Sequence, residues 1–234
     1  MRSIWQDVRH SLRVARRHPG AVAVAVLSLA IGIGANSVVF SLVDGMFLRP
    51  LPVRDPAGLV RVEWRSVDNQ QDDLAWADFE TLRESAGSFA DLAVQNRRGA
   101  LLETGGELDL MPLTIVSDNY FALLGIEARR GRLFDERLDA ALDEGPAVAI
   151  TDGLWRRRYG SDPAIVGRTL RLNNRAFTIV GILPPDFRGL QRAIETDLWI
   201  PASTWRAMGN GREFEDRVVG QFEVLGRLKD GASL

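Results

Sequence analysis

The sequence predicts an α+β extracytoplasmic domain preceded by one transmembrane helix and a short amphipathic helix. Three observations predict this class. An uncharged, largely apolar run extends from Gly20 to Val43, five arginines and one acidic residue precede it, and the rest mixes strand-like alternation with short helical patterns. We therefore divide the chain into a basic segment (residues 1–18), a transmembrane helix (19–48) and an outer domain (49–234).

The basic segment reads as a helix that lies in the plane of the membrane. From Ser3 to Arg17 the apolar residues recur at helical spacing on one face, and most arginines favour the other. Pro19-Gly20 then breaks this helix. The simpler alternative is a basic flank with no defined helix. The expected anchors at the membrane interface are Trp5, Arg13, Arg16 and Arg17.

The apolar run is long enough to span a membrane. At a rise of about 1.5 Å per residue it makes a helix roughly 36 Å long, against a hydrocarbon core of about 30 Å. The basic flank places the N-terminus in the cytoplasm and the residues after about 48 outside. A cleaved signal peptide is an alternative, but the apolar run continues past Gly34-Ala35-Asn36. A buried helix of a soluble protein is seldom so uniformly apolar.

Small and polar residues within the run predict a helix–helix contact. Ser28 and Gly32 are four residues apart, as are Ala30 and Gly34, and small pairs let two backbones approach closely. Asn36 carries an amide that needs a partner in hydrocarbon. The candidate packing residues are Ser28, Gly32, Gly34 and Asn36.

The outer domain reads as hairpins interspersed with short helices, which is why we predict the α+β class. A polar loop is expected at 68–73 and an acidic loop at 135–145, with turns at Gly105-Gly106 and Asn173-Asn174. Helices are expected at 76–84, 88–93 (capped by Ser88), from the Ser117-Asp118-Asn119 cap through Leu124, and at 152–159. Strands are expected at 59–64, 100–103, 108–116, 148–151, 168–172, 175–183, 198–201 and 218–228.

Composition limits the partners of the outer domain. Acidic residues outnumber basic ones by 29 to 24 after residue 48, which argues against nucleic acid or an anionic membrane surface as the main partner. Cysteine is absent, so the fold must be held by an ordinary hydrophobic core and not by disulfides.

The sequence offers no catalytic, cofactor-binding or metal-binding residue, so we expect no enzymatic activity. Both histidines, His10 and His18, precede the apolar run, and no phosphate-binding loop of the G-x-x-x-x-G-K-[ST] type occurs. Arg156-Arg157-Arg158 reads as a solvated helix face, and Tyr120-Phe121 and Trp155 read as core. The acidic clusters read as solvated loops: Asp72-Asp73, Asp135-Glu136, Asp143-Glu144 and Glu213/Glu215/Asp216.

Ordered motifs along nearly the whole chain resemble a known family. L-S-L-A-I-G-I-G-A-N-S-V-V-F-S-L-V (27–43) and L-R-P-L-P (48–52) are similar to the start of FtsX-like/MacB-like ABC transporter permeases, closest to the acidobacterial-type duplicated permease subgroup. The outer segment resembles the MacB-like periplasmic core domain. Its matching motifs are S-D-N-Y-F-A-L-L-G-I (117–126), G-R-L-F (131–134), L-W-R-R-R-Y-G-S-D-P-A-I-V-G-R-T-L-R-L-N (154–173), F-T-I-V-G-I-L-P-P-D-F (177–187), D-L-W-I-P (197–201) and L-G-R-L-K-D-G (225–231).

The resemblance implies the N-terminal portion of a permease subunit in an ABC-type export or mechanotransmission system of the bacterial inner membrane. Such a subunit couples a separate cytoplasmic ABC ATPase to a periplasmic domain, works as a homodimer, and can engage a periplasmic partner. Family members carry three further spans after this domain, so the chain reads as truncated at its C-terminal end. The alternative is a non-transporting, single-span adaptor or binding module tethered in the membrane. The substrate stays open.

Overall fold

A computed structural model describes residues 19–43, 51–65, 71–72, 74–135, 145–191, 195–210, 222–229 and 231. The chain separates into two compact units, Met1–Pro50 and Leu51–Leu234. The predicted amphipathic helix with Trp5, Arg13, Arg16 and Arg17 lies outside the described residues. So do residues 44–48, most of both predicted polar loops, and residues 218–221 of the last predicted strand.

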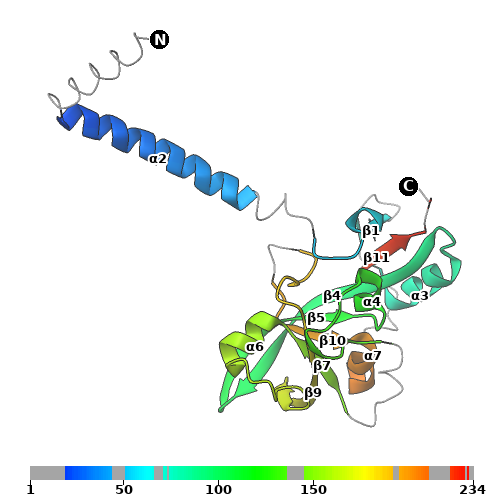
Figure 1. The fold of residues 1–234 in the computed structure, drawn as a ribbon. Helices are drawn as coiled ribbons and strands as arrows, with labels where there is room; N and C mark the ends of the chain where they lie inside the picture. Colours follow the sequence, from blue (N-terminus) through cyan, green and yellow to red (C-terminus); the bar gives the residue numbers. More distant parts are fainter. Residues whose placement is uncertain are drawn as a thin grey trace. The chain divides into compact units, whose positions relative to one another are not determined.

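The described part of the first unit is the helix α2 (Pro19–Val43), drawn in blue in Figure 1. Pro19 occupies its first turn, where the missing N–H and fixed φ of proline are compatible with a helix. Within α2, residues Val22–Ser41 are long and apolar enough to cross a membrane, and none of them is buried. The predicted apolar helix is therefore confirmed, although the described helix ends at Val43.

The second unit contains a mixed sheet with short helices around it (Figure 1). Its elements before residue 120 are η2 (Pro56–Gly58), β1 (Leu59–Val62), β2 (Trp64–Arg65), β3 (Gln71–Asp72), α3 (Trp76–Ser85), β4 (Phe89–Thr104) and β5 (Glu107–Val116). Those that follow are α4 (Tyr120–Leu124), β6 (Arg130–Gly131), β7 (Ala147–Ile150), α6 (Asp152–Tyr159), β8 (Thr169–Leu172), β9 (Arg175–Ile182), β10 (Leu198–Pro201), α7 (Ala202–Trp205), η4 (Arg206–Asn210, a π-turn) and β11 (Glu223–Leu228).

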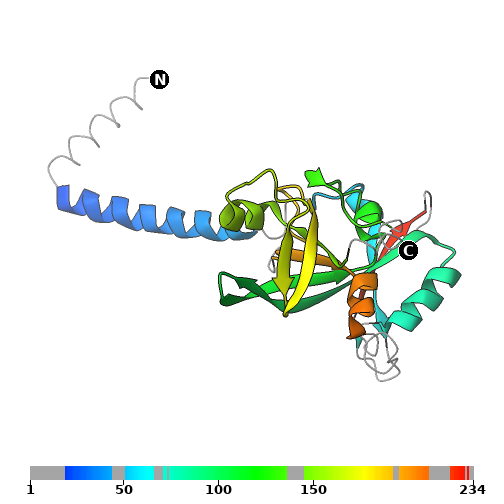
Figure 2. The same cartoon turned by 90° about the horizontal axis from the view of Figure 1, so that it is seen from below.

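Six of the strands pair in a closed ring. The sheet order is β1-β11-β4-β5-β10-β7-β9-β6, and β8 pairs with both β9 and β4. The ring therefore runs β4-β5-β10-β7-β9-β8 and back to β4. Two of its pairings are parallel, β10 with β5 and β7 with β9, and the others are antiparallel. Figure 2 shows the same unit turned by 90°, with the yellow β8–β9 hairpin and the green β4–β5 hairpin; β8 pairs with β4 and so closes the ring.

Alternation along the ring strands builds one core on each face of the sheet. In β10, Leu198 and Ile200 point into the ring, whereas Trp199 joins an aromatic cluster on the other face. That second cluster packs against α4: the ring centroid of Trp199 lies 5.5 Å from that of Phe121 and 5.7 Å from that of Tyr120. The interpretation of Tyr120-Phe121 as core is thus confirmed, and Trp155 is also buried.

Local signals predicted many elements well. The helix at 152–159, the strand at 198–201 and the hairpin around Asn173-Asn174 occur as expected. Both asparagines adopt positive φ, 48° and 65°, as a tight hairpin turn requires. The short elements β6, α7 and η4 were not predicted.

The helix predicted at 88–93 is wrong, because β4 begins at Phe89. Pairing with β11 places Ala93 opposite Leu225 and buries Leu92 and Val94 on the opposite face, which outweighs the cap-like Ser88. The Ser117-Asp118-Asn119 cap also differs from expectation. The Ser117 hydroxyl accepts the N–H of Val94 at 3.0 Å, and Asn119 donates to the carbonyl of Leu92, so these side chains fasten α4 to β4.

Candidate functional site

The predicted packing residues of α2 lie on two faces of the helix. At about 100° per residue, Ser28, Gly32 and Asn36 follow one another along one side, whereas Ala30 and Gly34 lie on roughly the opposite side. All of these residues are exposed, and a Cβ added at Gly32 or Gly34 would meet nothing within 4 Å. Both faces are therefore open to close approach by another helix.

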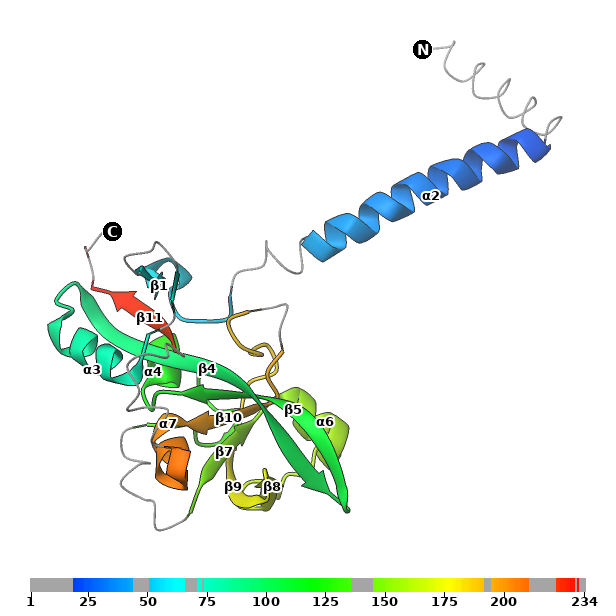
Figure 3. The ribbon, with the colours of Figure 1, turned by 180° about the vertical axis from the view of Figure 1, so that it is seen from behind.

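In the second unit, the strand that follows the apolar helix in sequence pairs with the last described strand. β1 runs antiparallel to β11, with Leu59 opposite Arg227 and Val62 opposite Val224. β11 then pairs with β4, so among the described strands β1 is hydrogen-bonded to the ring by way of β11 (Figure 3). We call residues 54–62 together with β11 the junction.

Arg227 fastens the start of the junction. Its guanidinium donates to the carbonyl of Arg54 at 2.7 Å, to that of Asp55 at 3.2 Å, and to that of Leu123 at 2.9 Å. The Leu123 carbonyl lies in the last turn of α4, where helix carbonyls lack an intrahelical partner. The Arg227 side chain is 17% exposed. The rigid fork of arginine donors thus joins three backbone segments at one point.

Close backbone packing supports the same contact. The N–H of Arg54 donates to the carbonyl of Leu124 at 2.8 Å. Gly125 ends α4 with a φ of 69°, and a Cβ there would lie 2.6 Å from the Cβ of Arg54. Glycine at this position therefore permits both the helix end and the approach of the junction.

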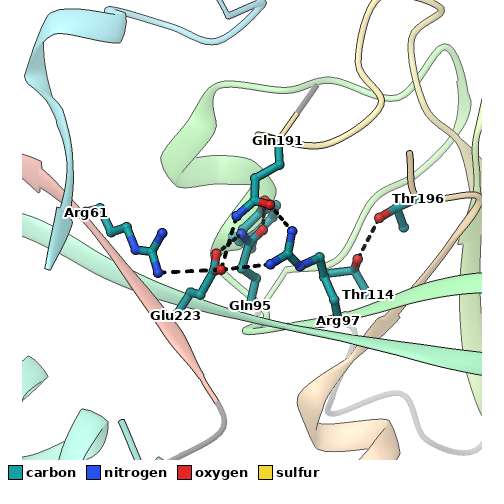
Figure 4. Close-up of polar contacts among 8 residues, drawn as sticks. Arg61, Gln95, Arg97, Thr114, Gln191, Thr196 and Glu223 are labelled. Carbon is teal, nitrogen blue, oxygen red and sulfur yellow. Dashed lines mark hydrogen bonds and ion pairs between the residues drawn. The ribbon is translucent and has the colours of Figure 1, made fainter. Parts of the chain in front are cut away.

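A polar network centred on Glu223 holds the other end of the junction (Figure 4). The Glu223 carboxylate accepts from Gln95 Nε2 at 2.6 Å, from Arg97 at 3.1 Å and from Gln191 at 3.2 Å, and Arg61 lies 3.7 Å away. Only 12% of the Glu223 side chain is exposed. A carboxylate so shielded needs paired charges and donors, and this network supplies them from β1, β4 and the segment before β10.

Tyr120 extends the network into the aromatic core. Its hydroxyl donates to Gln95 Oε1 at 2.7 Å, which fixes the orientation in which the Gln95 amide faces Glu223. Complete burial, reinforced by the nearby Glu223 charge, raises the pKa of Tyr120 well above its ordinary value, so the hydroxyl keeps its proton. The junction is thus connected to the same cluster that packs α4 on the sheet.

The profile of the MacB-like periplasmic core domain matches residues 22–234 of this chain. The chain belongs to this family. Over 89 residues it is 27% identical to the macrolide export ATP-binding/permease protein MacB of Neisseria gonorrhoeae and to that of Neisseria meningitidis. This match covers 38% of the chain and 13% of each relative, so the chain spans a small part of their length.

Solved structures share the fold of this MacB-like domain. The periplasmic region of MacB from Actinobacillus actinomycetemcomitans aligns with a TM-score of 0.54 at 14% identity, covering 77% of this chain and 80% of the other. The extracellular domain of the noncanonic ABC-type transporter YknZ from Gram-positive bacteria aligns with a TM-score of 0.54 at 10% identity, covering 74% and 84%. The mixed α+β class predicted for the outer domain is confirmed.

The three arginines at 156–158 form ion pairs on the MacB-like domain. Arg156, Arg157 and Arg158 pair with Asp152, Asp197 and Asp109 respectively, and the first two are more than half exposed. Across the ranges that the structure describes, no three His, Cys, Asp or Glu side chains group in a way that could hold a metal ion. The acidic cluster at 213–216 lies outside those ranges.

Sequence reasoning missed the junction. Glu223 and Arg227 were assigned only to a strand, and Gln95 to no element. The available signal was the presence of charged or amide side chains inside apolar strands, as in L-A-V-Q-N-R (92–97) and F-E-V-L (222–225). Such residues are buried only where partners satisfy them, but the sequence does not identify those partners.

The two faces of α2 can be separated by leucine substitutions. If the chain pairs through the Ser28/Gly32/Asn36 face, Gly32→Leu should abolish helix–helix crosslinking in membranes, because the larger side chain prevents close backbone approach. Gly34→Leu on the other face is the matched control and should leave crosslinking unchanged. The measurement is the yield of a cysteine crosslink introduced at residue 29. Equal yields from both variants and the parent would contradict pairing through either glycine.

Proposed function

We propose that this chain is a permease portion of an ABC-type export system, coupling a separate cytoplasmic ATPase to its periplasmic domain. The proposed location is the bacterial inner membrane, with the N-terminus in the cytoplasm and residues after about 48 in the periplasm. The basic residues before the apolar helix support this orientation. Membership of the MacB-like family and the permease relatives support the transport role.

The coupling proposal is based on the junction. Any displacement of the apolar helix reaches the outer domain through residues 51–62, since these are the next described residues along the chain. Arg227 and the Glu223 network connect that segment to β11, α4 and β4. Charge-assisted contacts that are partly shielded from water have defined geometry and little freedom, so we expect them to transmit a displacement instead of absorbing it. In the full permease, a second copy would provide a symmetric pair of such junctions.

A cysteine pair across the junction tests the proposal. The chain contains no cysteine, and Val62 and Val224 are Cα partners in the β1–β11 register, so a disulfide between V62C and V224C is geometrically reasonable. In membranes of the native host, which contain the cognate ATPase, we expect ATP with vanadate to change the rate of oxidative crosslinking at this pair.

The matched control is L101C/L110C, two exposed cross-strand partners in the β4–β5 hairpin. Its crosslinking rate should not depend on ATP. If nucleotide changes neither rate, or changes both equally, ATP-driven coupling through the junction is wrong. The non-transporting tethered adaptor then becomes the better account of this chain.

A further inference from the structure

A pocket of about 150 Å³ opens at one end of the six-stranded ring. We call it the ring-end pocket. Five of the six ring strands contribute to it, and the α7–η4 segment forms the remaining wall, which lies beside β10 and β5 (Figure 3). Its lining residues are Ala100, Leu113, Leu172, Asn173, Arg175, Phe177, Ile200, Trp205 and Met208. The mouth of a closed sheet is a common place for a small-molecule site.

The inner wall of the ring-end pocket is apolar and is formed by buried core residues. Leu113, Leu172, Phe177 and Ile200 are each at most 2% exposed and belong to the core inside the ring. Protein interiors are close-packed and contain few voids larger than a water molecule. A comparable apolar cavity of about 150 Å³ is known to accept benzene. The size and lining therefore suit a single aromatic ring or a short alkyl chain.

The rim of the pocket carries a cation. Arg175, the first residue of β9, is exposed and makes no ion pair with the described residues. Arg171 on the same hairpin pairs with Glu103 at 3.0 Å, and Arg168 just before it pairs with Asp162 at 2.6 Å. The arginine that lines the pocket is thus unlike its two neighbours, because no carboxylate of the described residues pairs with its donors.

The helical wall of the pocket also contains a hydrogen-bond donor, the indole N–H of Trp205. The indole Nε1 of Trp205 is buried and finds no acceptor among the described residues. Buried donors are rarely left without a partner, because desolvation is then uncompensated. Trp205 is followed directly by the π-turn Arg206–Asn210, which includes the lining residue Met208. Such turns are frequent at functional sites.

We propose that the ring-end pocket binds the apolar end of a small organic anion, whose carboxylate or similar head group pairs with Arg175. The apolar walls take up a ring or short chain, and the guanidinium at the rim selects a negative charge over a neutral polar group. The pocket shares no residue with the junction, so this binding site does not depend on the coupling function proposed above.

Phenylacetate is a suitable probe, and phenylacetamide is its neutral counterpart of nearly the same shape. The full chain in lipid nanodiscs is titrated with each compound by calorimetry, and empty nanodiscs correct for partition into lipid. We expect phenylacetate to bind and phenylacetamide to bind about tenfold more weakly, because it lacks the charge-assisted contact. Failure of both compounds to bind would overturn the proposal.

Two variants locate the site. Arg175→Gln should weaken phenylacetate binding by about tenfold and leave phenylacetamide unchanged. Arg168→Gln removes an arginine that lies just before the hairpin and does not line the pocket, and should change neither affinity. Met208→Trp fills the pocket from its helical wall and should abolish binding of both compounds while the thermal unfolding midpoint stays within a few degrees. Binding that survives both Arg175→Gln and Met208→Trp would place the ligand elsewhere and overturn the proposal.

Discussion

Trp199→Ala is expected to lower the free energy of unfolding of the outer domain by about 3–5 kcal/mol. The Trp199 side chain is 1% exposed and lies at the centre of the aromatic cluster, 5.5–5.7 Å from the rings of Tyr120, Phe121 and Phe187. Its removal leaves a cavity that β10, paired on both sides, cannot collapse to fill. Urea unfolding of the full chain, followed by circular dichroism, measures the loss.

Two comparisons make the Trp199 result specific. Leu110→Ala removes an apolar side chain that is 74% exposed and should change stability by about 0.5 kcal/mol or less. Trp199→Phe should cost less than Trp199→Ala, because it keeps a ring in the cluster and also removes a buried Nε1 that has no acceptor among the described residues. A loss of less than about 1 kcal/mol for Trp199→Ala would show that this cluster contributes little to the stability of the outer domain.

Arg227→Ala is expected to destabilise the outer domain by about 2–3 kcal/mol, since three backbone carbonyls lose a charged donor together. The effect should be concentrated at the junction, so we also expect faster proteolysis between residues 51 and 62. Chemical unfolding and limited proteolysis of the full chain measure the two effects. Arg227→Lys should recover only part of the stability, because an ammonium cannot reproduce the planar fork.

Arg171→Ala is the matched surface control for Arg227→Ala. Its ion pair with Glu103 is about half exposed, so its loss should change stability by less than about 1 kcal/mol. If Arg227→Ala resembles this control in both measurements, the three carbonyl contacts contribute little and Arg227 does not fasten the junction.

The elements that were predicted correctly have local causes. In α6, the Thr151 hydroxyl accepts the N–H of Leu154 at 3.2 Å and Gly160 ends the helix with a φ of 57°, so both ends are specified within ten residues. The Asn173-Asn174 turn is equally local. The apolar helix could be predicted from the length of the uncharged run and from the arginines that precede it.

The features that were missed have causes far away in the sequence. Residues 89–93 form a strand only because β11, more than 130 residues later, pairs with them. Closure of the ring requires Leu102 to meet Leu172, and no pattern in either segment identifies the other. The candidate site follows the same rule: Glu223 depends on Gln95 and Arg97 of β4 and on Arg61 of β1, all more than 120 residues before it in the sequence. Such pairings are decided by packing and not by propensity.

The ring is held unevenly around its circumference. Ten residue pairs join β4 to β5, but only two join β4 to β8 (Leu102–Leu172 and Glu103–Arg171), and only two join β10 to β7. Local opening of a protein follows the boundaries where the fewest contacts must break. Of these two seams, β10–β7 is buried in the core, whereas β8 is partly exposed, so we expect local opening of the ring to begin between β4 and β8. Because Ala100 and Leu172 line the ring-end pocket beside this seam, we expect such an opening to widen the pocket and to speed the entry and exit of a bound molecule.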